Sequence, residues 1–293
     1  MTPDASSHAL SFASVADAYD RARPSYPVEA AEWLVGSDPA RIVELGAGTG
    51  KLTEILVAAG HQVLATDPLP EMLALLAGRV PGARTAVATA HQIPVATHSV
   101  DVVVCAQSFH WFADSVALDE IARVLRPGGV LALVWNIRDE GIPWVRKFGA
   151  IIGGHRDAGG TDDLAGAVRE SALFGGTEER EFRNWSSLRR EDLFDLVRSR
   201  SYVAVLTEHE RADLLARVGA LYDDYGRGPD GMKLPYLARC YRAVVSDQVP
   251  AASPVPEHVL PTADPDATEA ISRAALVDAA PPRDPGTVLI DFK

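Results

Sequence analysis

The stretch VELGAGTGKLT, residues 43–53, decides which fold the chain is expected to adopt. The run RIVEL at 41–45 predicts a strand, glycines follow at positions 46, 48 and 50, and a helical pattern continues to residue 59. Glycine lets the backbone approach a ligand closely, and a helix starting there directs its first N–H groups at that ligand. A dinucleotide fingerprint would have its third glycine where this chain has Lys51, so that match fails.

A second element follows in HQVLATD, residues 61–67, which predicts a strand ending at Asp67. A carboxylate at this point can accept hydrogen bonds from both hydroxyls of an adenosine ribose. The alternative is a plain strand-end aspartate that caps the next helix, predicted over 70–80. Together with Glu44 and the three glycines, Asp67 indicates an adenosine ligand that carries no pyrophosphate.

The rest of the chain up to residue 245 alternates short strands with helices, which is typical of a parallel sheet covered by helices. Further strands are expected at 84–88, 99–107, 130–136 (after a turn RPGG), 178–188 and 232–245, and helices at 114–125, 191–201 and 209–224. The last strand contains Pro235, which suits the beginning of a strand or a sheet edge. The expected fold is therefore α/β and Rossmann-like: seven strands, the last antiparallel, with helices on both faces.

Composition narrows the possible partners and compartment. The chain has 293 residues, 47% of them hydrophobic, and a net charge of −12, which disfavours nucleic acid as a general partner. Neither a secretory signal nor an apolar run long enough to span a bilayer is evident. Cys105 and Cys240 lack a CxxC spacing and the histidines are scattered, so we expect reduced thiols, no metal and a cytoplasmic protein.

Two segments differ from the main domain, which is assigned to residues 1–248. Helices inserted between residues 137 and 230 are expected to form a lid over the acceptor site. Residues 249–293 are rich in Pro, Ala and Asp, which predicts a disordered tail, or alternatively a docked lid or interface. One helix is expected within the tail, over 267–279. The sequence leaves the oligomeric state open.

These elements resemble the class I S-adenosylmethionine-dependent methyltransferases over residues 10–245. The resemblance includes TAHQIP (89–94), VDVVVCAQSFHWF (100–112) and RVLRPGGVLALVWN (123–136). Within that family, YDRARPSYP (19–27), SFHWF (108–112), SRSY (199–202) and KLPYLARCY (233–241) are similar to a small-molecule branch. This branch comprises enzymes like trans-aconitate methyltransferase and those of ubiquinone biosynthesis.

The resemblance implies a cofactor, S-adenosyl-L-methionine, and a set of residues that hold it. Gly46 and Gly48 would leave room for its methionine part, Asp67 would hold the ribose, and Pro68 or Leu69 would pack on the adenine. The remaining implied contacts come from Glu44, Gly50, Ala90, His91, Gln107 and Arg23, the last from an N-terminal helix that covers the site. His91 stands where the family more usually has an acidic residue.

The implied reaction is an in-line attack by a small organic acceptor on the sulfonium methyl, for which alignment and exclusion of water matter most. His110 is the candidate general base, if the acceptor arrives protonated. The alternative for His110 is that it packs in its loop and positions Trp111. Trp111, Phe112, Trp144, Tyr202 and, less strongly, Tyr236 are candidates for the acceptor pocket.

Two other functions remain possible from the sequence. One is a non-catalytic protein that binds adenosylmethionine as a scaffold, and the other is a nicotinamide-dependent oxidoreductase. Lys51 argues against the oxidoreductase, and the intact glycine turn argues against a degraded cofactor site.

Overall fold

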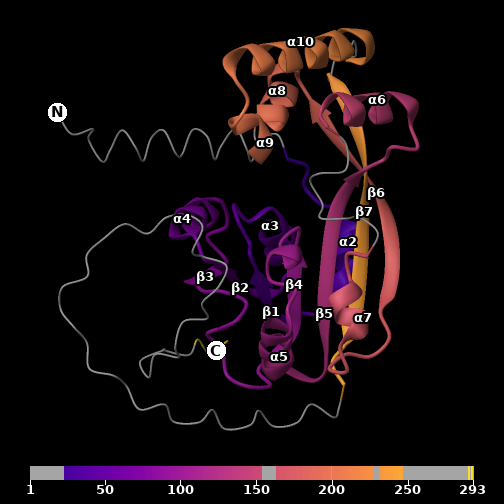
Figure 1. Cartoon of the computed structure of the whole chain (residues 1–293). Helices are drawn as coiled ribbons and strands as arrows, with labels where there is room; N and C mark the ends of the chain where they lie inside the picture. The colour runs from indigo at the N-terminus through magenta and orange to yellow at the C-terminus, as the bar shows by residue number, and fades with distance from the viewer. Residues whose placement is uncertain are drawn as a thin grey trace, which may run out of the picture.

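The computed structural model describes residues 23–153, 163–198, 200–226 and 231–246, together with residues 290 and 292. Within these residues lies a seven-stranded sheet in the order β3-β2-β1-β4-β5-β7-β6 (Figure 1). Its strands are β1 (Arg41–Leu45), β2 (Gln62–Asp67), β3 (Arg84–Val87), β4 (Val100–Ala106), β5 (Leu125–Arg138), β6 (Glu178–Leu188) and β7 (Met232–Val244). The first five pair in parallel, and β7 runs antiparallel to both β5 and β6. The predicted fold class is confirmed.

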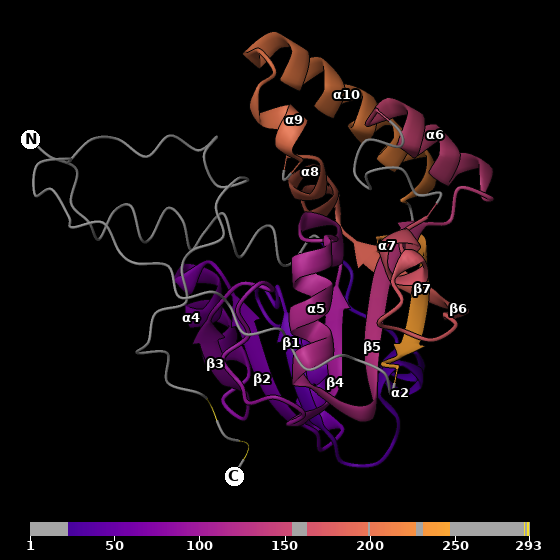
Figure 2. The same cartoon turned by 60° about the horizontal axis from the view of Figure 1, so that its bottom comes forward.

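Helices cover both faces of the sheet because successive strand residues point to opposite faces. One face packs against α2 (Val28–Val35), α3 (Lys51–Ala58) and α4 (Pro70–Arg79), through strand residues such as Val102, Val104 and Val134. The other face packs against α5 (Ser115–Val124) and α7 (Gly166–Glu170), through Val103, Leu133 and their neighbours (Figure 2).

A separate group of helices lies at one end of the sheet. It consists of α6 (Pro143–Ile151), α8 (Arg190–Arg198), α9 (Ser201–Ala204) and α10 (Glu208–Tyr225). These helices share a hydrophobic cluster of their own, which includes Phe148, Leu193 and Val218. We call these four helices the cap. In Figures 1 and 2 the cap lies beyond the carboxyl ends of β1, β2 and β4.

The cap differs from the expected lid in two ways. Helix α7 packs with α5 on the sheet and does not join the cap, because Val168 and Ala165 lie in the same core cluster as Leu133. The helix expected over 191–201 is α8, which ends at Arg198, and α9 is a separate short helix that was not predicted and begins after Arg200.

Two strand predictions need correction. The RPGG segment is not a turn that precedes the fifth strand, because β5 begins at Leu125 and contains it. The register against β4 shifts there, from Val100 opposite Leu125 to Val102 opposite Val130, so the segment is an irregularity within the ladder. Pro235 lies inside β7, immediately before Tyr236 in the chain. Tyr236 pairs with Arg138, and this is the last pair between β7 and β5. The chain tolerates a proline there because its missing N–H falls past the end of that ladder.

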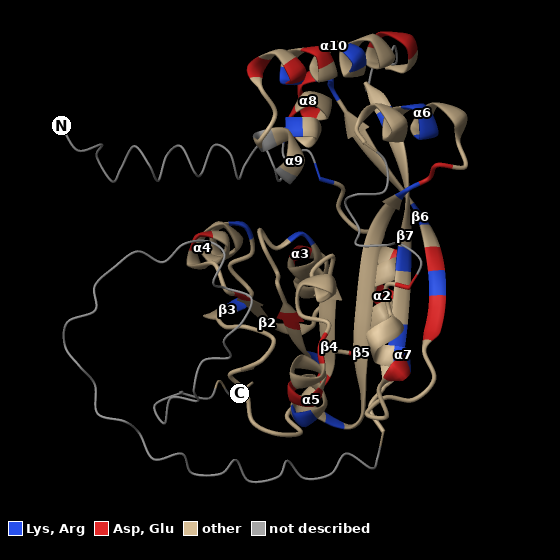
Figure 3. Ribbon diagram, in the orientation of Figure 1, with Lys and Arg blue, Asp and Glu red and all other residues tan. Residues whose placement is uncertain are grey.

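The two edges of the sheet are protected in different ways. Strand β3 has four residues only, while β6 has eleven and carries Glu178, Glu179, Arg180, Glu181 and Arg183 (Figure 3). The five are exposed. Charged side chains on an edge strand discourage another strand from pairing with it.

The end of the chain returns to the sheet. Ile290 donates a backbone hydrogen bond to the carbonyl of Pro94 at 2.7 Å, and Ile290 and Phe292 pack against the α5 side of the core. The helix expected over 267–279 lies outside the described residues. Within the part of the chain that the structure describes, no helix is long and apolar enough to cross a bilayer.

Candidate active site

A cavity of about 590 Å³ opens at the carboxyl ends of β1, β2 and β4. Strand β1 lies between β2 and β4, so the chain leaves it in one direction toward β2 and β3 and later returns to β4 on its other side. Open α/β sheets bind ligands at this reversal of strand order. The cavity therefore lies where the fold class predicts a binding site.

The floor of the cavity is the glycine turn between β1 and α3. Gly46, Gly48 and Gly50 have φ angles of +68°, +55° and +85°, which non-glycine residues rarely adopt. At Gly46 a side chain is also excluded by space, because its Cβ would lie 2.6 Å from Cβ of Ser108. At Gly48 a Cβ would meet nothing within 4 Å. Gly46 and Gly48 line the cavity, whereas Gly50 turns toward Leu76 of α4.

Asp67 connects this turn to the next strand. Its Oδ2 accepts a hydrogen bond from the Gly48 N–H and its Oδ1 accepts one from the Leu69 N–H, both at 2.9 Å. The side chain lines the cavity and is 7% exposed. The alternative of a plain helix cap does not describe this geometry, because no side chain caps α4 and Asp67 reaches back to the glycine turn instead.

Glu44 lies beneath the turn and is fully enclosed at 1% exposure. Thr53, in the first turns of α3, donates a hydrogen bond to Glu44 Oε2 at 2.6 Å. Burial raises the pKa of Glu44 to about 8, opposed by the Thr53 hydrogen bond and assisted by the nearby charge of Asp67. Glu44 is therefore largely protonated at neutral pH, and Thr53 belongs to the same motif that the sequence analysis quoted.

The far wall of the cavity contains Ala90 and His91 after β3. His91 Nε2 lies 2.8 Å from Oδ2 of Asp114, the residue that caps α5. Asp114 is therefore the acidic partner of His91, although it does not itself line the cavity. Sequence reasoning missed Asp114 because the two residues are 23 positions apart and only the fold brings them together.

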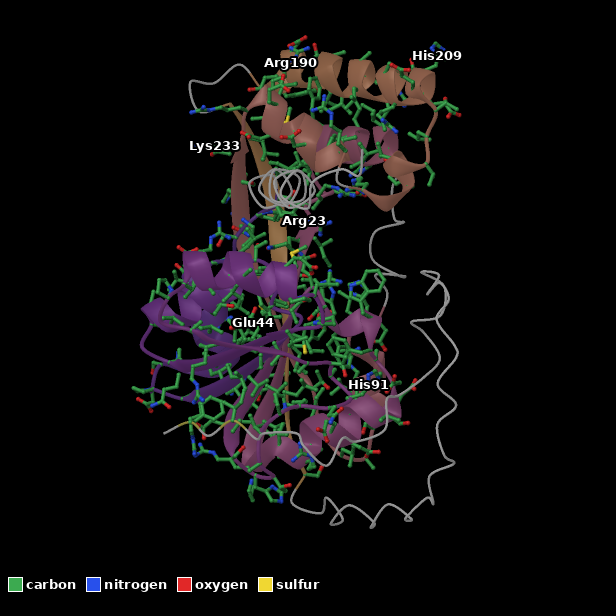
Figure 4. The ribbon with its side chains drawn as sticks, turned by 90° about the vertical axis from the view of Figure 1, so that its left-hand side faces the viewer. Arg23, Glu44, His91, Arg190, His209 and Lys233 are labelled. Carbon is green, nitrogen blue, oxygen red and sulfur yellow. The ribbon has the colours of Figure 1, made fainter. Side chains whose placement is uncertain are left out.

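Arg23 lines the cavity from the segment that precedes α2 and lies between the cap and the α/β core (Figure 4). It occupies a bend and not a helix, because α2 begins at Val28 after Pro27. The segment is held by Ser25, whose carbonyl accepts hydrogen bonds from Asn136 Nδ2 at 3.1 Å and Asn184 Nδ2 at 2.6 Å. These two asparagines, on β5 and β6, were not predicted as site residues.

The remaining predicted residues fall into two groups. Pro68, Gln107, Trp111 and Phe112 line the cavity, as do Tyr26, Thr66 and Ser108, which were not predicted. Trp144 and Tyr202 do not line it: Trp144 stacks on Tyr225 with ring centres 5.7 Å apart, and the Tyr202 hydroxyl donates to the carbonyl of Ile152 at 2.8 Å. Both pack against the cap cluster.

His110 lies beside the cavity on the one-turn helix Phe109–Trp111 that follows β4. Its ring contacts Trp111, with centroids 4.8 Å apart, and its Nδ1 lies 3.5 Å from Nε1 of Trp135. The indole N–H can only donate, so this contact favours the tautomer with Nδ1 as acceptor. Burial and, to a smaller extent, the charge of Arg23 lower the pKa of His110, so the ring is mainly neutral at pH 7.

The fold and the site define a class of α/β proteins that bind an adenosine ligand. In this class the binding cavity combines a glycine turn with a carboxylate at the end of a strand. The Methyltransferase domain family matches residues 43–133. The chain is 44% identical over 240 residues to an uncharacterized methyltransferase of Mycobacterium tuberculosis, covering 81% of this chain and 96% of that one. The chain belongs to the class I S-adenosylmethionine-dependent methyltransferases, and its cofactor is S-adenosyl-L-methionine.

Two other comparisons extend this result. A trans-aconitate 2-methyltransferase of Rhodopseudomonas palustris is 35% identical over 119 residues, which cover 39% of this chain and 44% of that one. A solved structure described as a candidate type II methyltransferase, from Anaeromyxobacter dehalogenans, has a TM-score of 0.60 and 24% identity, and covers 76% of this chain and 97% of that one. The structural likeness supports the fold. Membership of the family decides for a methyltransferase over the scaffold and oxidoreductase alternatives.

Proposed function

We propose that this methyltransferase transfers the methyl group to a small organic acceptor. The observation that carries the proposal is the cavity of about 590 Å³, which Trp111 and Phe112 border. The cap helices lie beyond the same carboxyl ends of the strands at which the cavity opens (Figure 1). The trans-aconitate relative, whose name gives a small organic molecule as its substrate, supports the same conclusion. Family membership and the two free, buried cysteines, Cys105 and Cys240, support a cytoplasmic enzyme with reduced thiols.

The cofactor would be held by residues that line the cavity. Asp67 has a fixed orientation because two backbone N–H groups already bind it, and its carboxylate can accept further hydrogen bonds from ribose hydroxyls. Gly46 and Gly48 would leave room for the methionine end of the cofactor, and Pro68, Leu69, Ala90 and His91 would border its adenine. Gln107 and Arg23, which also line the cavity, would lie toward the methionine end. Bound S-adenosylmethionine supplies a methyl group on a cationic sulfur, which is already activated for transfer.

The chain's own contribution is to align the acceptor and to exclude water, and both effects account for large rate accelerations in group transfer. Of the two roles considered for His110, its geometry supports the positioning of Trp111. The ring lies against Trp111, and its Nδ1 lone pair faces the Trp135 indole.

A direct experiment tests the proposed function. The protein is incubated with S-adenosylmethionine labelled in the methyl group and with an extract separated into small molecules and macromolecules. We expect label in the small-molecule fraction, and at least about tenfold less of it in a reaction with an Asp67→Asn variant at limiting cofactor. Label found only in protein or nucleic acid would contradict the proposal.

The role of His110 is tested by two variants at one position. His110→Phe keeps a ring against Trp111 but cannot accept a proton, whereas His110→Ala removes both properties. We expect His110→Phe to retain kcat within about threefold and His110→Ala chiefly to raise the acceptor KM. If both variants lose about 100-fold or more in kcat, the size expected for a general base, His110 is the base instead.

A further inference from the structure

One wall of the cavity is a segment without regular secondary structure. Residues 88–99, all of which the structure describes, connect β3 to β4 and contain neither a helix nor an extended strand. We call them the wall segment. Ala88, Thr89, Ala90 and His91 of this segment line the cavity. The two alanines have no polar side-chain atom, so any hydrogen bond that they make to a ligand comes from their backbone. The position of this backbone therefore decides what the wall can recognise.

A pair of charged residues on α5 holds the backbone of the wall segment. Arg123 donates hydrogen bonds from Nε to Glu120 Oε2 at 2.7 Å and from Nη2 to Glu120 Oε1 at 2.8 Å. Glu120 Oε1 also accepts the N–H of Ile93 at 2.8 Å. Nη2 and Nη1 of Arg123 donate to the carbonyls of Ile93 and Val95, respectively, both at 3.1 Å. The pair thus binds the N–H and the C=O of Ile93 as well as a second carbonyl.

The Glu120–Arg123 pair is shielded from water. The side chain of Glu120 is 7% exposed and that of Arg123 is 20% exposed. A buried ion pair is often no more stabilising than apolar side chains of similar volume, because both charges lose their water. The pair does, however, bind backbone groups in fixed directions, which apolar side chains cannot do. Its effect is therefore to fix where the wall segment lies.

Packing connects this ion pair to the residues that line the cavity. Ile93 is 2% exposed and packs in one cluster with Ala90 and with Ile121 of α5. Ala90 lies three positions before Ile93, so a displacement of Ile93 also displaces the wall. His91 is attached to the same helix, because its Nε2 lies 2.8 Å from Oδ2 of Asp114. Helix α5 therefore holds the wall segment at more than one point.

We propose that Glu120 and Arg123 are positioning residues for the cofactor: they hold the wall segment so that its backbone recognises the adenine of S-adenosylmethionine. Neither residue lines the cavity, and each acts through its hydrogen bonds to the wall segment. This inference rests on the placement of the cofactor proposed above, with the adenine beside Ala90 and His91. It does not depend on which acceptor receives the methyl group.

The test compares two ligands in calorimetric titrations of the full chain. S-Adenosylhomocysteine carries adenine, whereas S-inosylhomocysteine carries hypoxanthine, in which an oxygen replaces the amino group and a ring nitrogen gains a hydrogen. A backbone held beside the base distinguishes these two patterns of donors and acceptors. We expect wild type to bind S-adenosylhomocysteine about fivefold or more tightly than the inosyl compound, the equivalent of one hydrogen bond.

Three variants locate the effect. In Arg123→Gln the preference for adenine should fall to about twofold or less, and S-adenosylhomocysteine should bind about fivefold or more weakly. Glu120→Gln should act in the same direction, since the uncharged amide binds the guanidinium less strongly. Arg123→Lys keeps the charge without the planar fork and should retain an intermediate preference. A general loss of stability would weaken both ligands equally and leave the preference unchanged.

Arg198→Gln is the matched control. Arg198 forms another ion pair with the residue three positions before it, Asp195, on α8, which contributes no residue to the cavity lining. This variant should keep both the affinity and the preference of wild type. Thermal melts show whether each variant is folded, and the two Arg123 variants, at the less buried position of the pair, carry the test if Glu120→Gln does not fold.

Hydrogen exchange followed by mass spectrometry gives a second readout. In Arg123→Gln, peptides that cover the wall segment should exchange faster than in wild type, because two of its carbonyls lose their guanidinium donor. Peptides from β1 and β2 should exchange at the rate of wild type. Faster exchange throughout the sheet would mean that the pair stabilises the whole domain and has no particular effect on the wall.

Two results of the titrations would overturn the positioning role: no preference for adenine in wild type, or a preference that survives both Arg123→Gln and Glu120→Gln. Asp67→Asn separates these failures from a wrong placement of the cofactor. If that variant binds S-adenosylhomocysteine as wild type does, the placement itself is wrong. If it binds weakly while the two glutamine variants bind normally, only the positioning role fails. Transfer of the methyl group to macromolecules only would contradict the proposed acceptor and leave this inference standing.

Discussion

At the scale of single residues, Asp67 organises the cavity in which we propose that the cofactor binds. It fixes the glycine turn through Gly48 and the start of the following segment through Leu69. Asp67→Asn keeps the shape of the side chain but replaces one acceptor oxygen with an NH₂ donor. We expect cofactor binding to weaken by about 1.5–3 kcal/mol, the value for a hydrogen bond to a charged group. Calorimetric titration with S-adenosylhomocysteine measures this loss, and unchanged affinity in the folded variant would contradict the assignment.

Glu44 gives a second prediction at this scale, which concerns pH. Its folded pKa of about 8 lies above the ordinary 4.5, so the unfolded state loses this proton first as pH rises. The contribution of Glu44 to stability is therefore full below pH 4.5 and is lost progressively as pH rises through about 8. Glu44→Gln keeps an acceptor for Thr53 and cannot ionise. The free energy of unfolding of this variant, relative to that of wild type, should therefore increase from pH 5 to pH 9.

Urea unfolding at pH 5, 7 and 9 checks this prediction. Glu178→Gln, at an exposed position of β6, is the control and should follow wild type at each pH. If the difference between Glu44→Gln and wild type is the same at all three values, Glu44 does not titrate in this range.

At the scale of elements, the asparagine pair on β5 and β6 positions the segment before α2. Asn184 Nδ2 donates to the Ser25 carbonyl at 2.6 Å and also to Asn136 Oδ1 at 2.9 Å. Asn184→Ala removes both of these hydrogen bonds and leaves the Ser25 carbonyl held by Asn136 alone among the described side chains, so the segment that carries Arg23 is less firmly held. We expect the affinity for S-adenosylhomocysteine to fall severalfold, with a loss of stability of about 1 kcal/mol per hydrogen bond at most.

Ser186→Ala provides the matched control, since Ser186 lies two positions further on the same face of β6. Calorimetry gives the affinity and a thermal melt gives the stability. An affinity loss of the same size in both variants would mean that the affinity depends on strand β6 in general and not on the hydrogen bonds of Asn184.

The elements also show how far sequence reasoning reaches. Strands β1, β2 and β4 and helices α3, α4 and α5 were predicted closely, because each combines a clear periodicity with a terminal signal such as Pro70 or the glycine turn. The cavity residues in those strand ends were found for the same reason. The contact of His91 with Asp114 and the hydrogen bonds of Asn136 and Asn184 to Ser25 were missed, because each depends on residues that only the folded chain brings together. The RPGG segment was misjudged because a bulge and a turn share the same composition.

At the scale of the whole molecule, the end of the chain contributes to the core. Ile290 and Phe292 pack beside the segment that contains Pro94, close to the cavity wall at Ala90. Phe292 is partly buried, so Phe292→Ser should lower the free energy of unfolding by about 1–2 kcal/mol, somewhat less than for a fully buried side chain. Val205→Ser, at a position 84% exposed, should have almost no effect.

Urea unfolding of the full chain and of both variants checks this expectation. Equal stability of Phe292→Ser and wild type would show that the contact contributes nothing in solution.

The charged edge strand β6 has a consequence for how the protein behaves when concentrated. An eleven-residue strand with open N–H and C=O groups would serve as a template for fibril growth if its surface were apolar. The Glu and Arg side chains in the first half of β6 instead make the approach of a second molecule depend on register, since a shift of one residue changes which charges face each other. Engineering this strand toward valine or threonine for stability would therefore replace a charged edge with one that favours pairing between molecules.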